Sequence, residues 1–114
     1  MFVFGSAEDI AQSLCESIKA RTPGLVDKPL DEMTLEEMKR MLTVFRMAAH
    51  EARQVGSSED SMEMLLEWHD DVLRALVAVD ERLRRRVLSG KYQYPRKRTQ
   101  ANRLHYTKIA EEGA

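Results

Sequence analysis

The sequence predicts an all-α protein built on a long antiparallel helical hairpin, and three observations support this fold class. Apolar residues recur three and four residues apart, capping residues precede these runs, and glycine or proline separates them. With 43% hydrophobic residues among 114, the chain can bury one small core. We expect a three-helix bundle over residues 1–90 and a basic extension over residues 91–114.

The first helix is expected over residues 7–20. Ser6, followed three residues later by Asp9, forms a capping-box pattern that satisfies the free amides of a helix start. Proline disfavours helical geometry in the preceding residue, and glycine tolerates a turn, so Pro23 and Gly24 should end this helix. The apolar residues at helical spacing are Ala7, Ile10, Leu14 and Ile18.

The second helix has the strongest start signal in the sequence. Thr34 can cap the first amides while Glu37 reaches back to the Thr34 backbone. The helix should end near Val55, because Gly56 can adopt the left-handed conformation of a helix cap. Its apolar stripe comprises Leu35, Met38, Leu42, Phe45, Ala49 and Ala52.

The third helix is predicted to begin after Ser57 or Ser58 and to continue to Ser89 and Gly90. Roughly 30 residues of helix would exceed the second helix by about two turns. Its apolar stripe comprises Met62, Leu65, His69, Val72, Leu76, Val79 and Leu83. Residues 99–110 are expected to form a short fourth helix, which has few apolar residues and therefore needs a packing partner.

Both central helices carry a second apolar stripe beside the first. A helix with two apolar faces needs two neighbours, and the first helix can cover only part of this surface. We therefore expect the hairpin to be completed by dimerisation. The residues predicted for self-association or partner contact are Met41, Phe45, Leu66, Leu73, Leu76 and Val77.

Charge is strongly segregated along the chain, although the net charge is only −1. Residues 1–81 hold 17 acidic and 8 basic side chains, net −9, whereas residues 82–114 hold 10 basic and 2 acidic, net +8. Basic side chains interleaved with tyrosines are suited to phosphates and unpaired bases. The residues predicted to contact nucleic acid or an acidic partner are Arg82, Arg85, Arg86, Lys91, Tyr92, Tyr94, Arg96, Lys97, Arg98 and Arg103.

Two alternatives to this interpretation concern the same charged residues. Arginines near a helix C-terminus can complement its dipole, and a charged tail can serve solubility.

On the third helix, Glu67 and Asp70 fit the ExxD half of the magnesium site of all-α nucleotide pyrophosphohydrolases. The ExxE half is absent from the preceding helix, and such a site needs several converging carboxylates.

The histidines predict structural roles. His69 lies in an apolar stripe and is expected to be a hydrogen-bonded core or interface residue, with a ligand or pH-sensing role as the alternative. His50 lies near the end of the second helix, at a different height of the hairpin, so a metal site shared by both is not expected.

Other functional classes lack support in the sequence. It contains no glycine-rich phosphate loop, no HExxH and no motif of a nucleophilic enzyme, so we expect no catalytic residues, metal or cofactor. The single Cys15 cannot form an internal disulfide, and we find no signal peptide or apolar run long enough for a membrane.

A cytoplasmic, non-enzymatic regulatory or adaptor protein is the leading hypothesis. A protein-binding inhibitor or chaperone docking on a larger machine is the second, and the carboxylate-metal hydrolase is the third.

Overall fold

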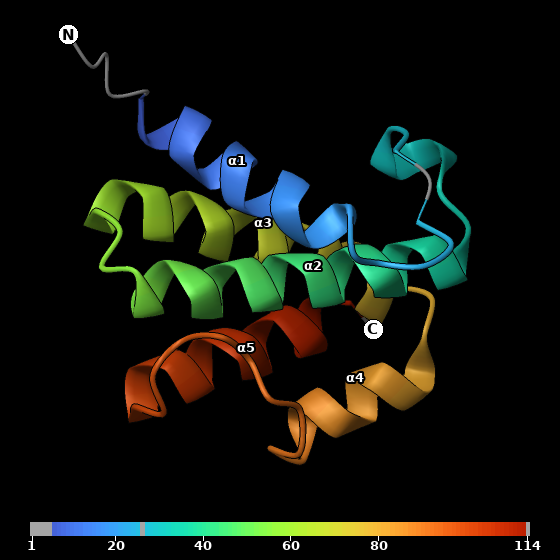
Figure 1. Ribbon diagram of the computed structural model, residues 1–114. Coiled ribbons are helices and arrows are strands. Elements are labelled where there is room, and N and C mark those ends of the chain that lie inside the picture. The colour runs from blue at the N-terminus through green and yellow to red at the C-terminus, as the bar shows by residue number, and fades with distance from the viewer. Residues whose placement is uncertain (1–5, 26, 114) are drawn as a thin grey trace, which may run out of the picture.

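The computed structural model describes residues 6–25 and 27–113, and the described chain is helical (Figure 1). Its elements are α1 (Ala7–Lys19), the 3-10 turn η1 (Leu30–Glu32), α2 (Leu35–Gln54), α3 (Glu59–Val77), α4 (Glu81–Leu88) and α5 (Gln100–Glu112). The all-α class is therefore confirmed. In the described ranges, no helix is both long and apolar enough to cross a bilayer.

The helix starts follow from local capping. The Ser6 and Thr34 capping boxes both form, with the Glu37 carboxylate accepting from the Thr34 amide at 3.0 Å. At the end of α2, Gly56 adopts a φ of +68°, which favours glycine. Thr99 caps α5 by accepting from the Asn102 amide at 3.1 Å. The expected starts of these helices are confirmed because capping depends on residues close in sequence.

The expectation of one continuous third helix was wrong. The structure ends α3 at Val77 and starts α4 at Glu81, with Asp80 as the new cap accepting from the Leu83 amide at 3.1 Å. An aspartate that bonds a nearby backbone amide competes with continuation of the helix. A straight helix would also have carried its last apolar residues beyond α2, whereas the turn brings Val87 into the core.

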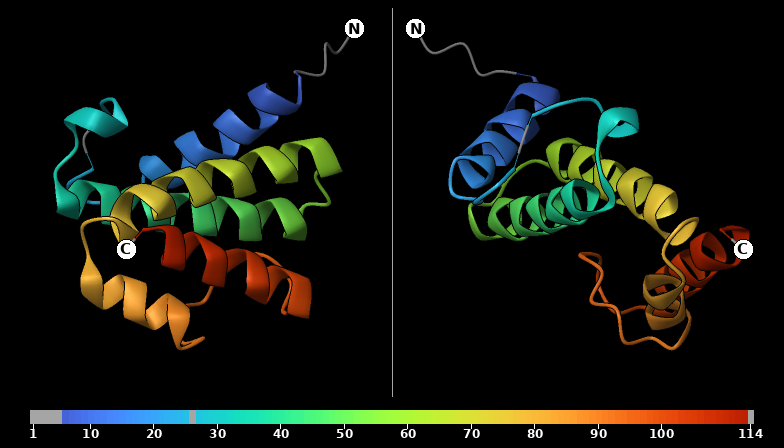
Figure 2. Two further views of the ribbon diagram at one scale, coloured as in Figure 1. Left: turned by 180° about the vertical axis from the view of Figure 1, so that it is seen from behind. Right: turned by 90° about the vertical axis from the view of Figure 1, so that its right-hand side faces the viewer.

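The helices lie on both sides of a central pair. Antiparallel α2 and α3 pack along each other, with α1 on one side and α4 and α5 on the other (Figures 1 and 2). The chain passes from α4 to α5 through a loop, residues 89–99, which runs beside the C-terminal half of α2 (Figure 1). We call α4, this loop and α5 the C-terminal layer.

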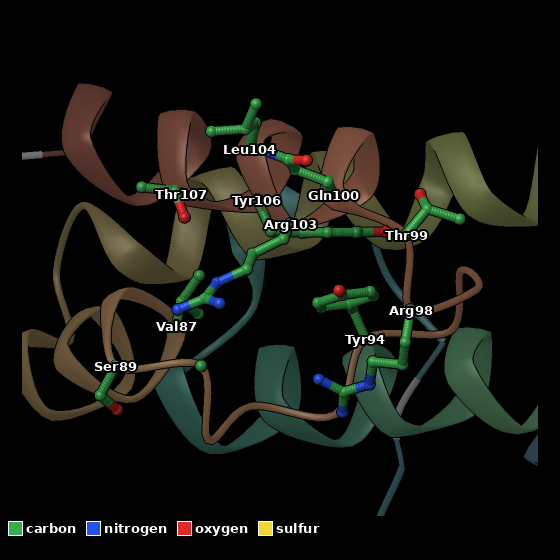
Figure 3. A pocket seen from close by; sticks show the side chains of 11 residues that line it. Val87, Ser89, Tyr94, Arg98, Thr99, Gln100, Arg103, Leu104, Tyr106 and Thr107 are labelled. Carbon is green, nitrogen blue, oxygen red and sulfur yellow. The ribbon is translucent and has the colours of Figure 1, made fainter.

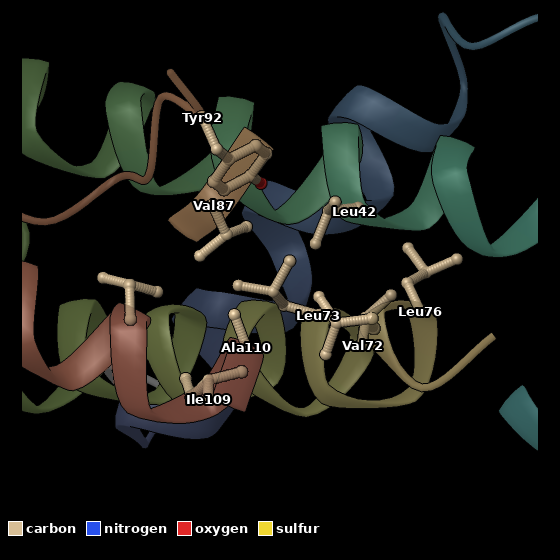
Figure 4. Close-up of a cluster of buried hydrophobic side chains, with 10 residues drawn as sticks. Leu42, Val72, Leu73, Leu76, Val87, Tyr92, Ile109 and Ala110 are labelled. Atoms are coloured by element: carbon tan, nitrogen blue, oxygen red, sulfur yellow. The ribbon is translucent and has the colours of Figure 1, made fainter. Parts of the chain in front are cut away.

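Both sides of the central pair are covered within one chain. On the α1 side, the core contains Ala11, Cys15 and Ile18 from α1 together with Leu65 and Leu66 from α3. On the opposite side, apolar residues of α2 and α3 pack against the C-terminal layer (Figure 4). Its buried members are Leu42, Val72, Leu73, Leu76, Val77, Val87, Tyr92, Tyr106, Ile109 and Ala110.

The residues expected at a dimer interface belong largely to this monomer core. The buried ones are Met41, Leu66, Leu73, Leu76 and Val77, and Phe45 is half-buried. The second apolar stripe thus finds its neighbours in α1 and the C-terminal layer. Its existence no longer requires a second copy of the chain.

Candidate nucleic-acid interface

The residues predicted to contact nucleic acid fall into two groups in the structure. Seven are exposed on the C-terminal layer: Arg82, Arg85, Arg86, Lys91, Lys97, Arg98 and Arg103. The other three are covered to different degrees, because Tyr92 is buried while Tyr94 and Arg96 are half-buried. The exposed group is entirely cationic, so the accessible chemistry of this layer is that of guanidinium and ammonium groups.

A surface hollow of about 710 Å³ lies between the end of α4, the loop and α5 (Figure 3). Arg98 and Arg103 are its charged residues, and no aspartate or glutamate lines it. The other lining residues are polar or apolar: Val87, Ser89, Gly90, Tyr94, Thr99, Gln100, Leu104, Tyr106 and Thr107. A recess with two cations and no carboxylate is suited to an anion.

The Arg98 side chain is held in place by an aromatic pair. The Tyr94 ring stacks on Tyr106 with 4.3 Å between ring centroids, and the Arg98 guanidinium lies 4.5 Å from the Tyr94 centroid. Cation–π contact of this kind orients a guanidinium without neutralising its charge. Tyr94 is thus in contact with two protein groups, Tyr106 and the Arg98 guanidinium.

Some basic residues of the layer are neutralised locally and others are not. Arg84 and Arg85 pair with Glu81, at 2.6 and 3.2 Å. Arg96 pairs with Glu63 and Asp70, both at 3.2 Å. In residues 6–25 and 27–113, no carboxylate forms an ion pair with Arg82, Arg86, Lys91, Lys97, Arg98 or Arg103.

The C-terminal layer is anchored on one buried carboxylate, Asp70 of α3, which is 2% exposed. Its Oδ1 accepts from the Tyr106 hydroxyl at 2.8 Å and lies 2.9 Å from His69 Nδ1. Its Oδ2 lies 2.9 Å from His105 Nε2 and accepts from Arg96 Nη2 at 3.2 Å. Both the loop and α5 are therefore tied to α3 at this point.

The protonation states of the anchor follow from burial and hydrogen bonding. Burial would raise the pKa of Asp70, but hydrogen bonds from His69, His105 and Tyr106 outweigh it and lower this pKa to about 2. Burial lowers the pKa of His69 in spite of the neighbouring carboxylate. A neutral His69 that donates from Nδ1 to Asp70 accepts at Nε2 from the Tyr92 hydroxyl, 2.8 Å away. The expected role of His69 as a hydrogen-bonded core residue is confirmed.

The structure corrects the expected role of the tyrosines. Tyr92 and Tyr106 are 4% and 1% exposed, so neither presents a ring face to an unpaired base. Burial raises the pKa of Tyr92 to about 12, which keeps its hydroxyl protonated as a donor. A buried tyrosine usually finds a hydrogen-bond partner for its hydroxyl, and this was the one sequence signal that could have pointed to the anchor.

Of the two carboxylates considered for a magnesium site, Asp70 already has protein partners. Glu67 and Asp70 line a second hollow of about 340 Å³, together with Arg74, Arg96 and His105. Both oxygens of Asp70 already face protein hydrogen-bond donors. Among the residues described, no three His, Cys, Asp or Glu side chains are arranged to hold a metal ion.

Comparison with known proteins adds no assignment to this geometry. No protein-family model, curated protein or solved structure matches the chain. The two features that bear on function are therefore the unpaired cations of the C-terminal layer and the buried anchor that fixes the loop carrying Arg98.

Proposed function

We propose that this chain is a non-enzymatic regulatory protein whose C-terminal layer binds the phosphate backbone of nucleic acid. The observation that carries the proposal is the hollow lined by Arg98 and Arg103, which contains no carboxylate. Guanidinium groups bind phosphate oxygens through paired hydrogen bonds, and Arg98 is already oriented by Tyr94. Such preorganisation lowers the entropy lost on binding.

The charge distribution supports binding through this one layer. Residues 1–81 carry a net charge of −9 and repel a polyanion, whereas residues 82–114 carry +8 and attract it. A polyanion therefore approaches from the side of the C-terminal layer. The acidic helices on the opposite side stay available for docking to a protein, which fits a regulator or adaptor.

The proposed recognition is of phosphate rather than of base identity. The tyrosines of the layer are engaged with protein groups, and phosphate contacts carry no direct sequence information. We expect sequence-independent binding that weakens steeply with salt. A plot of the logarithm of the binding constant against the logarithm of the salt concentration gains a slope of about −0.9 for each neutralised phosphate of duplex DNA. Single strands should give about −0.7 for each contact.

The test is fluorescence anisotropy with labelled duplex and single-stranded oligonucleotides over a range of salt concentrations. We expect binding at about 50 mM salt, and a duplex slope that becomes shallower by about 2 when Arg98 and Arg103 are both replaced by glutamine. The matched control replaces Arg21 and Arg74 by glutamine, which removes the same charge from exposed positions outside the C-terminal layer. It should keep the wild-type slope.

The same assay distinguishes nucleic acid from an acidic protein partner. Polyglutamate presents carboxylates in place of phosphates and serves as the competitor. No binding to either oligonucleotide at about 50 mM salt overturns the proposal. Competition by polyglutamate at an equal concentration of charges overturns it too and favours the second candidate, a module that docks on a protein.

A reducing compartment such as the cytoplasm is part of this proposal. The single cysteine of the chain, Cys15, is a buried free thiol of the α1 core. It contributes there as a small apolar residue and has no disulfide to maintain.

A further inference from the structure

A second cationic recess shares Tyr94 with the first one. It has a volume of about 180 Å³ and is lined by residues of α2 and of the loop in the C-terminal layer. Arg46, His50 and Arg53 lie four and three residues apart, so they share one face of α2. The loop contributes Gln93, Tyr94, Pro95 and Arg96.

No acidic residue lines this recess, and of its arginines only Arg96 is paired with carboxylates outside it in the described part of the chain. Three arginines and one histidine line it, and no carboxylate does. Arg96 directs Nη2 away to Glu63 and Asp70, while its Nε is buried without a hydrogen-bond partner. Arg46 and Arg53 form no ion pair with a described carboxylate, so their mutual repulsion raises the electrostatic free energy of the folded chain, and an anion in the recess would lower it.

Structural roles account for part of this arrangement. Arg53 Nη2 donates to the Pro95 carbonyl at 2.7 Å, which holds the loop against α2. The Arg46 guanidinium lies 6.0 Å from the centroid of the Tyr92 ring. Both contacts orient the guanidinium groups and leave their charges unneutralised. His50, in contrast, is exposed at the recess.

Tyr94 connects this recess to the hollow described above, because it lines both. Arg98 and Arg103 lie in one recess, and Arg46 and Arg53 lie in the other. Two cationic recesses that share one lining residue are suited to a ligand that carries several phosphates along a chain. Residues 1–81, although acidic in total, therefore contribute to the basic surface through one face of α2.

We propose that Arg46, His50 and Arg53 form a second phosphate-binding subsite, so that a nucleic-acid backbone crosses Tyr94 from α5 to α2. This inference rests on the proposed function and extends it by adding α2 to the contact surface. The ligand at the subsite is a phosphodiester group, bound by charge and by hydrogen bonds from arginine.

The experiment compares two glutamate substitutions on α2. His50→Glu places a negative charge in the recess, whereas Gln54→Glu adds the same charge at an exposed position of α2 that does not line it. His50→Glu should weaken oligonucleotide binding about fivefold or more in the anisotropy assay, since one unscreened charge contact changes affinity by that order. Gln54→Glu should stay within about twofold, because a charge outside the recess does not contact the bound phosphate and is screened by salt. Arg46→Gln should make the salt slope shallower by about 1.

A second measurement probes the subsite without nucleic acid. Inorganic phosphate is titrated at constant ionic strength while the imidazole NMR signals are followed. The His50 signals should shift with saturation, and those of buried His69 should not. Thermal melting monitored by circular dichroism verifies that each variant is folded.

The outcomes separate the two proposals. If the wild type binds oligonucleotides but His50→Glu and Arg46→Gln behave like Gln54→Glu, the second subsite is overturned and the proposed function stands. If oligonucleotides do not bind but phosphate shifts His50 with saturation, the proposed function fails and the subsite takes a smaller phosphate ligand. If neither probe binds, both proposals are overturned.

Discussion

Replacement of Asp70 by asparagine tests whether the buried anchor holds the C-terminal layer in place. An aspartate carboxylate offers acceptor oxygens to all four of its neighbours. Asparagine keeps one oxygen and presents an NH₂ group in place of the other. In either orientation of the amide, two of the four neighbouring donors face another donor.

The size of the effect follows from these lost acceptors. A buried donor without a partner costs about 1–3 kcal/mol, and the Arg96 charge keeps Glu63 as a second partner. We therefore expect Asp70→Asn to lower the free energy of unfolding by about 3 kcal/mol. A domain of this size is stable by about 5–15 kcal/mol, so the variant should still fold.

Urea denaturation followed by circular dichroism measures this loss, and Asp71→Asn is the matched control. Asp71 is the next residue of α3, exposed and paired with Arg74, so its replacement should cost less than about 0.5 kcal/mol. Asp70→Asn should reduce the urea midpoint by about 1–3 M. In hydrogen exchange, α5 should lose protection while α1 keeps it. Equal midpoints for the two variants would refute the anchoring role.

Three further predictions concern other parts of the molecule. Stability should fall on acidification first below about pH 6.5, because the folded state lowers the pKa of His69 and the unfolded chain then binds the proton more readily. Stability should fall again as the pH drops from 3.8, the ordinary pKa of Asp70, to about 2, its pKa in the folded state. This second loss should amount to about 2 kcal/mol in total. A urea midpoint that does not change with pH over both ranges would contradict both steps. Cys15 should react with a thiol reagent only after unfolding, since burial raises its pKa to about 11, and rapid labelling of the native protein would disprove this. Light scattering should give the 13.2 kDa of one chain, because most residues of both apolar stripes are covered within the chain, and twice that mass would show that another surface pairs.

The parts of the fold that were predictable from sequence depend on neighbouring residues. Ser6 and Thr34 cap α1 and α2 as expected, and Thr99 caps α5. The caps act over three residues, so the pattern alone contains the necessary information. The short last helix was also expected to need a partner, and it packs on α3 and α4.

The parts that escaped prediction depend on residues far apart in the chain. Asp70 and Tyr106 are separated by 36 positions, and local patterns carry no information on such a contact. Asp70 also lies among exposed acids, Glu63, Glu67 and Asp71, so its neighbours in the sequence give no sign that it is buried. The Asp80 cap, in contrast, is local, but the apolar stripe that continues through Val79 and Leu83 predicted an unbroken helix.

The order in which the anchor is assembled has a consequence during synthesis. The ribosome releases α3, with His69 and Asp70, before the segment that contains Tyr92, Arg96 and Tyr106. Until that segment has emerged, the carboxylate and the apolar side of α3 face the solvent without their partners. A nascent chain stopped after Gly90 would thus expose core residues to chaperones and proteases, and we expect quality control to remove it.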